Sequence, residues 1–147
     1  MVTLIEINKA INDRIKESKL GTEFNNVPII PEDVSEPIIR PSIKVSIGYS
    51  SNGNFNAHCR EKTLTCRVYF FARDRYKYKI DNLKMQDILE NAFLNDLEIK
   101  EGFFIPVDNV ESEVIDTVLV CSFDLYTVEE LADTDTSELM ETLELNL

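Results

Sequence analysis

The sequence predicts an α+β fold, in which a mainly antiparallel β-sheet carries two α-helices packed on one face. Two segments have helical periodicity, several alternate as strands do, and the predicted order is α-β-β-β-α-β-β. A chain of 147 residues fits one domain with one hydrophobic core. We therefore expect a single domain over residues 1–128 and a flexible acidic tail over residues 129–147.

The first helix is predicted over residues 3–18. Its apolar residues recur at spacings of three or four and so share one face: Leu4, Ile7, Ile11 and Ile15. Thr3, with Glu6 three residues later, has the form of a capping box. Gly21 stands where a C-terminal cap is expected.

Prolines and alternation define the next segments. Four prolines exclude a helix and leave room for a short edge strand over residues 27–30: Pro28, Pro31, Pro37 and Pro41. Residues 42–47 alternate between apolar and polar, which predicts a half-buried strand. Residues 50–58 are polar and contain Asn52-Gly53, a pair typical of tight turns, so they predict a loop.

The strongest strand is predicted over residues 62–72. One row of its side chains is apolar: Leu64, Cys66, Val68 and Phe70. The opposite row also carries bulky residues, which is compatible with cover by a helix or by a neighbouring subunit. A basic, tyrosine-rich connection follows it.

The second helix is predicted over residues 81–96, with an inner stripe of Met85, Ile88, Leu89, Ala92 and Phe93. A short strand over residues 102–107 is expected to end at the acidic segment 108–116. The last long strand covers residues 117–127, and its inner row is Leu119, Cys121, Phe123 and Leu125. After Val128 the sequence is acidic and lacks aromatics, so we expect a flexible tail, or an arm that orders on a partner.

The charge distribution is uneven. The net charge is -12, which argues against a general nucleic-acid binder. Residues 58–79 nevertheless hold seven Lys or Arg against two acids, whereas residues 128–147 hold seven acids and no base. The chain is thus acidic with one basic segment.

Three interpretations of this basic segment remain open. It contains the candidate interface residues Arg67, Arg73, Arg75, Lys77, Lys79, Tyr76 and Tyr78. Basic residues interleaved with aromatics can bind single-stranded nucleic acid. They can also form a simple solvated strand edge. We favour a third interpretation, an electrostatic contact between copies of the chain that closes head-to-tail into a ring.

No catalytic residue, cofactor site or metal site is predicted. His58 is the single histidine, and it adjoins Cys59 on a chain whose neighbouring side chains point to opposite sides. Two carboxylate clusters fit solvated loop charge: Glu32, Asp33 and Glu36, and Glu111, Glu113 and Asp116. Three unpaired cysteines indicate reduced thiols and a cytosolic setting, with Cys59 as the candidate exposed thiol. No apolar run is long enough to span a membrane.

Four segments together resemble the phage tail-terminator family, whose members occur in prophages and bacteriocin clusters. They are VTLIEINKAINDRIKE, VPIIPEDVSEPIIRPSIKV, CREKTLTCRVYFFARDRYKYKIDNLKMQDILENAF and EGFFIPVDNVESEVIDTVLVCSFDLYTVE. The resemblance covers roughly residues 1–130. It implies small subunits that assemble as a ring, typically a hexamer, on the last ring of tail tube protein.

Such a ring stops tube polymerisation and offers a surface to the head connector. The resemblance implies no catalytic residue or cofactor. It places the protein in the host cytoplasm during assembly and then in the phage tail or tail-like particle, with sheath proteins as further candidate partners. The alternatives are another neck or head-tail joining protein, and a small acidic regulatory or inhibitor protein that mimics nucleic acid.

Overall fold

The computed structural model describes residues 2–30, 40–74 and 76–130. The first half of the chain forms α1 (Leu4–Lys19), β1 (Ile29–Ile30), β2 (Ser42–Asn54) and β3 (Cys59–Phe71). The second half forms α2 (Lys79–Ala92), β4 (Leu97–Lys100), β5 (Phe103–Ile105), β6 (Val107–Ile115) and β7 (Val118–Glu130). These elements confirm the α+β class.

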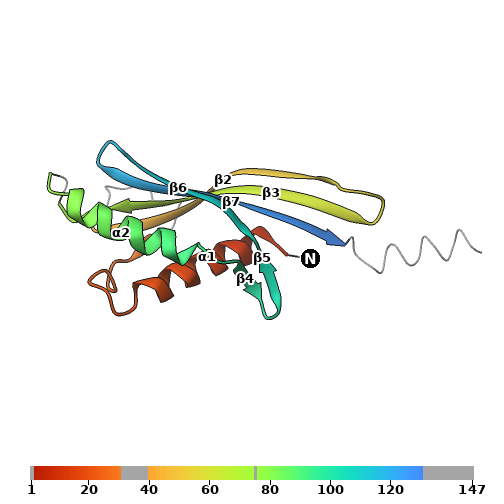
Figure 1. Cartoon of the computed structure of the whole chain (residues 1–147), viewed down its shortest axis with the longest axis horizontal. Helices are drawn as coiled ribbons and strands as arrows, with labels where there is room; N and C mark the ends of the chain where they lie inside the picture. Colours follow the sequence, from red (N-terminus) through yellow and green to blue (C-terminus); the bar gives the residue numbers. More distant parts are fainter. Residues whose placement is uncertain (1, 31–39, 75, 131–147) are drawn as a thin grey trace, which may run out of the picture.

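A five-stranded sheet in the order β1-β2-β3-β7-β6 forms one layer. β1 pairs parallel with β2, and the other pairs in this sheet are antiparallel. Both helices lie on the same face of the sheet, together with the small β4–β5 hairpin (Figure 1). The predicted mainly antiparallel sheet with two helices on one face is therefore confirmed.

The helix ends follow their capping residues. The Thr3 hydroxyl accepts a hydrogen bond from the Glu6 backbone N–H at 3.2 Å, and Gly21 takes a φ of +78° after α1, as the sequence predicted. α2 begins and ends earlier than predicted. At its end, the Arg14 guanidinium of α1 donates to the Ala92 carbonyl at 2.7 Å, a favourable position for a cation at a helix C-terminus.

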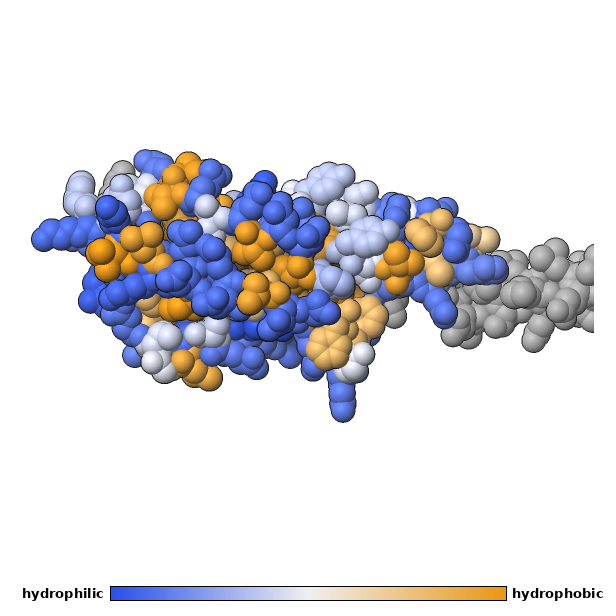
Figure 2. Space-filling view, viewed as in Figure 1, coloured by the Kyte–Doolittle hydropathy of each residue, from blue (hydrophilic) through white to orange (hydrophobic). Residues whose placement is uncertain are grey.

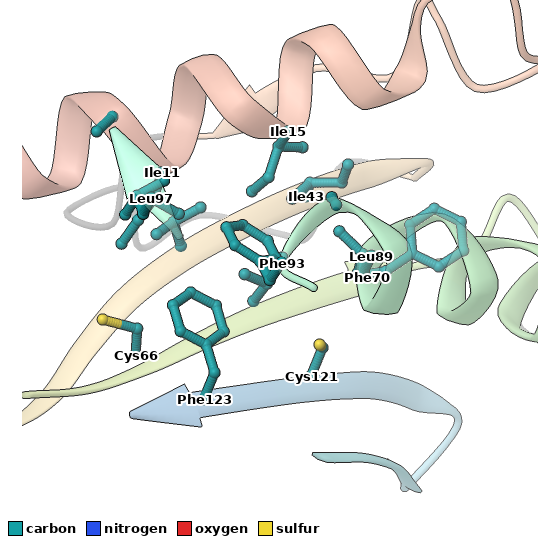
Figure 3. Packing of buried hydrophobic residues seen from close by; sticks show 14 of the residues in the cluster. Ile11, Ile15, Ile43, Cys66, Phe70, Leu89, Phe93, Leu97, Cys121 and Phe123 are labelled. Atoms are coloured by element: carbon teal, nitrogen blue, oxygen red, sulfur yellow. The ribbon is translucent and has the colours of Figure 1, made fainter. Parts of the chain in front are cut away.

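The hydrophobic core lies between the helices and the sheet. Phe93, just after α2, stacks on Phe123 of β7 with ring centroids 4.4 Å apart (Figure 3). The predicted inner rows of β3 and β7 are buried, and they meet Ile11 and Ile15 of α1 together with Met85 and Leu89 of α2. The alternation in the sequence thus identified the inward faces correctly.

The loop predicted over residues 50–58 is wrong. β2 continues to Asn54, and Asn52 and Gly53 pair with residues of β3 instead of forming the turn. The turn is short, and the Asn56 side-chain oxygen accepts from the backbone N–H groups of His58 and Cys59, at 2.8 Å each. Residues 48–58 are all exposed. With no core to face, these strand residues show no alternation of apolar and polar side chains.

Two strands in the second half also differ from the prediction. The acidic segment predicted to end a strand is instead β6, an edge strand of the sheet with an irregular register near Asn109, whose φ is +55°. Charged residues on an edge strand discourage pairing with other chains, which accounts for the acidic composition. β4 was not predicted, because four residues carry too short a pattern.

The last strand is longer than predicted. β7 extends to Glu130, so residues 129 and 130, assigned to the tail by composition, belong to the sheet. The remainder of the predicted tail, residues 131–147, lies outside the described residues, as do most of the proline-rich segment and the cluster of Glu32, Asp33 and Glu36. No helix among the described residues is long and apolar enough to cross a membrane.

Candidate assembly surfaces

The predicted basic segment is divided between two places. Arg67 lies in β3 on the sheet face opposite the helices, in a row with Ser46 of β2 and Ser122 of β7. Its guanidinium lies over Gly48, where no side chain obstructs it. The other described members lie beyond the end of β3, and Arg73 is six residues further along the chain, roughly 20 Å in extended backbone. Arg75 lies outside the described residues.

A groove lies at the start of α2. The groove has a volume of about 680 Å³, and its lining is mostly apolar. The lining residues are Tyr76, Lys77, Tyr78, Lys79, Ile80, Asn82, Leu83, Gln86 and Val114. Four of the residues named as the candidate interface therefore line one surface. Asn82 joins α2 to the turn between β6 and β7, because its buried side-chain amide donates to the Thr117 carbonyl at 3.2 Å.

Several residues that line the groove have large apolar side chains that are exposed to solvent. Tyr76 is 87% exposed, Ile80 60% and Leu83 51%. Figure 2 shows hydrophobic surface at this end of the molecule, over α2 and the β6–β7 turn. Contiguous exposed apolar surface commonly marks a contact with another protein. Sequence periodicity missed Ile80 and Leu83, because they lie off the inner stripe of α2.

The opposite end of the molecule carries a β-arm, defined here as residues 48–62 of β2 and β3 with residues 126–130 of β7. It projects past the helical layer (Figure 1). β1 pairs only with Ile43 and Lys44 of β2, and β6 pairs with β7 only as far as Leu125. No described strand covers either outer edge of the arm. Such edges can pair with a strand from another chain.

An ion pair lies at the far end of the arm, next to the turn between β2 and β3. Glu129 of β7 lies 3.1 Å from the Arg60 guanidinium of β3, and both side chains are largely buried. The other Glu129 carboxylate oxygen accepts from the Val2 backbone N–H at 3.1 Å. Three segments far apart in the sequence are thus joined by one carboxylate.

The sheet face opposite the helices is half-polar. No helix of the described chain packs on it. The Thr65 hydroxyl donates to Asp124 at 2.8 Å, and the Tyr126 hydroxyl donates to Glu61 at 2.6 Å. The hydrogen bond to Glu61 raises the pKa of Tyr126. The predicted cover of this face by a neighbouring subunit stays a prediction.

Two of the three cysteines of the described chain are buried in the core. Burial raises the pKa of the Cys66 thiol to about 12 and also raises that of Cys121, so both stay protonated at neutral pH. Cys59 is half-buried at the start of β3, not in an exposed loop as predicted. No group of three His, Cys, Asp or Glu among residues 2–30, 40–74 and 76–130 is placed to hold a metal ion.

The sequence matches one described protein family over most of its length. Residues 6–138 match the family described as phage tail terminator protein. The chain belongs to that family. The match spans most of the chain, including every described helix and strand apart from the first two residues of α1. A search of curated proteins gave no match.

A tail terminator is a structural, non-enzymatic kind of protein and a component of the phage tail. It interacts with other tail components. The surfaces described above are therefore candidate contacts with other proteins.

Proposed function

We propose that this tail terminator forms a ring that caps the tail tube, stops its polymerisation and offers a docking surface to the head connector. The family match over residues 6–138 is the observation that carries the proposal. A tube grows because each ring repeats the interface of the last ring. A capping ring matches the tube on one face and differs on the other.

Two unlike surfaces support a ring of subunits arranged head-to-tail. The groove at the start of α2 and the β-arm lie at opposite ends of the molecule (Figure 1). A contact between unlike surfaces leaves one of each free on every added subunit. Repetition of that contact closes into a ring when the rotation between neighbours allows it. A hexamer is the ring size that we propose.

Charge favours the same arrangement. The described basic residues at the groove end, Arg73, Lys77 and Lys79, are all exposed, in a chain whose net charge is -12. A basic surface on an acidic protein attracts the acidic surface of the next copy or of the tube ring. Arg67, on the outer sheet face, belongs to a second candidate contact.

The test reverses the basic charge at the groove end. A chain with Arg73→Glu, Arg75→Glu and Lys77→Glu is expected to lose ring or tube association while its circular dichroism spectrum stays unchanged. Lys9→Glu with Lys16→Glu is the control for added negative charge elsewhere, because both lysines are exposed on α1 and do not line the groove. Mass is measured by light scattering, alone and with the tube protein. Unchanged assembly of the reversed chain would remove these residues from the interface.

A further inference from the structure

We propose that the groove at the start of α2 binds the C-terminal segment, residues 131–147, of a neighbouring copy of the chain. This inference rests on the ring of the proposed function and names one contact within it. It is carried by matching apolar surface, by complementary charge and by the distance between the groove and the end of β7.

The apolar residues of groove and segment are complementary. The exposed groove residues Ile80, Leu83 and Val114 come from two elements that face a common hollow. The segment offers four large apolar residues at helical spacings, which fit one side of an amphipathic helix: Leu139, Met140, Leu143 and Leu147. Alone, such a short acidic segment has little to bury. Insertion into a groove is a common way to bury the apolar side of a short helix.

The charges are complementary as well. Lys77 and Lys79 line the groove, and no acidic residue does. The segment carries five acids and no base: Asp133, Asp135, Glu138, Glu141 and Glu144. Among the described residues that line the groove, the charged ones are both lysines, although the chain has 27 acids, and this favours the acidic segment over a basic partner.

Distance favours a neighbour's segment over the chain's own. The groove lies beside the β6–β7 turn, and β7 then carries the chain for 13 residues to the far end of the molecule (Figure 1). That strand is roughly 40 Å long at 3.3 Å per residue. Residues 131–138, even when fully extended, reach about 27 Å. Leu139 therefore falls short of the groove on its own chain, so the four apolar residues of the segment cannot enter that groove together.

The first experiment measures binding of the segment to the groove. A fluorescent peptide of residues 131–147 is titrated onto the full chain carrying Leu139→Asp and Leu143→Asp, whose own segment no longer competes. We expect saturable binding that weakens as salt increases. Adding Leu83→Asp is expected to weaken binding at least tenfold.

Leu94→Asp serves as the matched control, because Leu94 is exposed near the end of α2 and does not line the groove. It is expected to leave peptide binding unchanged. Absence of binding at about 1 mM peptide, or binding that Leu83→Asp leaves unchanged, would overturn the proposal.

The second experiment asks whether the contact joins two copies. A tagged chain with Leu83→Asp keeps its segment, and an untagged chain with Leu139→Asp and Leu143→Asp keeps its groove. Mixed, they are expected to be captured together, since the intact segment of one enters the intact groove of the other. A tagged chain with all three substitutions should not capture the untagged chain. Peptide binding without capture in the mixture would mean that the segment binds its own chain, contrary to the proposal.

Tube capping by the wild-type chain is recorded separately. If the wild-type chain caps tubes but the peptide does not bind, the segment contact is wrong and the proposed function stands. If the wild-type chain does not cap tubes but the two variants are captured together, the capping function is wrong and the contact stands.

Discussion

Replacement of Glu129 by alanine tests whether β7 is anchored as the structure describes. The carboxylate pairs with Arg60 at 3.1 Å and accepts from the Val2 backbone N–H at 3.1 Å. Its side chain is 8% exposed and that of Arg60 is 14% exposed, so little solvent compensates for their loss. Loss of one partner leaves the other charge buried and unpaired, which costs about 3–5 kcal/mol in a fully buried pair.

Partial exposure of Arg60 reduces that figure. We expect Glu129→Ala to lower the free energy of unfolding by about 2–4 kcal/mol. Glu129→Gln should lower the free energy of unfolding by less, because the amide oxygen still accepts from the Val2 N–H. A cost remains, since the charge on Arg60 is left unpaired. Glu130→Ala is the matched control, since Glu130 is exposed and next in sequence. Its expected change is within about 0.5 kcal/mol.

Urea unfolding followed by circular dichroism measures these differences. Equal stabilities for Glu129→Ala and Glu130→Ala would refute the anchoring of the β-arm. In that case residue 129 would behave as part of the tail that its composition predicted.

Three further predictions follow from the core. Phe93→Ala, which removes a buried ring stacked 4.4 Å from Phe123, is expected to cost about 3–5 kcal/mol in urea unfolding, whereas exposed Leu94→Ala stays near neutral. Iodoacetamide should label Cys59 first at pH 8, and mass spectrometry should detect labelled Cys66 and Cys121 only after unfolding. Because burial raises the pKa of Cys66 from 9.0 to about 12, the unfolded chain ionises first. The stability that the protonated Cys66 thiol contributes is fully present below pH 9 and is lost as pH rises toward 12. Cys66→Val should therefore reduce the loss of stability at alkaline pH. An equal alkaline loss in both proteins would contradict that assignment.

The parts of the fold that face the core were predictable from the sequence. The rows of β3 and β7 alternate because the helices cover one side of each strand, and the stripe of α1 repeats for the same reason. The polar half of β2 carried no such signal, since its residues have solvent on all sides. β6 was hidden by its acidic edge composition, and Glu129 by its place in an acidic run.

The candidate surface was predictable only in part. Lys77, Lys79, Tyr76 and Tyr78 line one groove, and the sequence grouped them correctly because they are adjacent in the chain. Arg67 was grouped with them although a strand holds it on another face. Ile80, Leu83 and Val114 were missed, since only the fold brings the start of α2 against the β6–β7 turn.

The central claim is that this chain ends tube growth. The most direct measurement is the length distribution of tubes assembled from the cognate tail tube protein, imaged by electron microscopy with and without gold-labelled terminator. We expect shorter tubes whose length falls as terminator is added, with label at one end only. Unchanged lengths, or label spread along the tube wall, would contradict it.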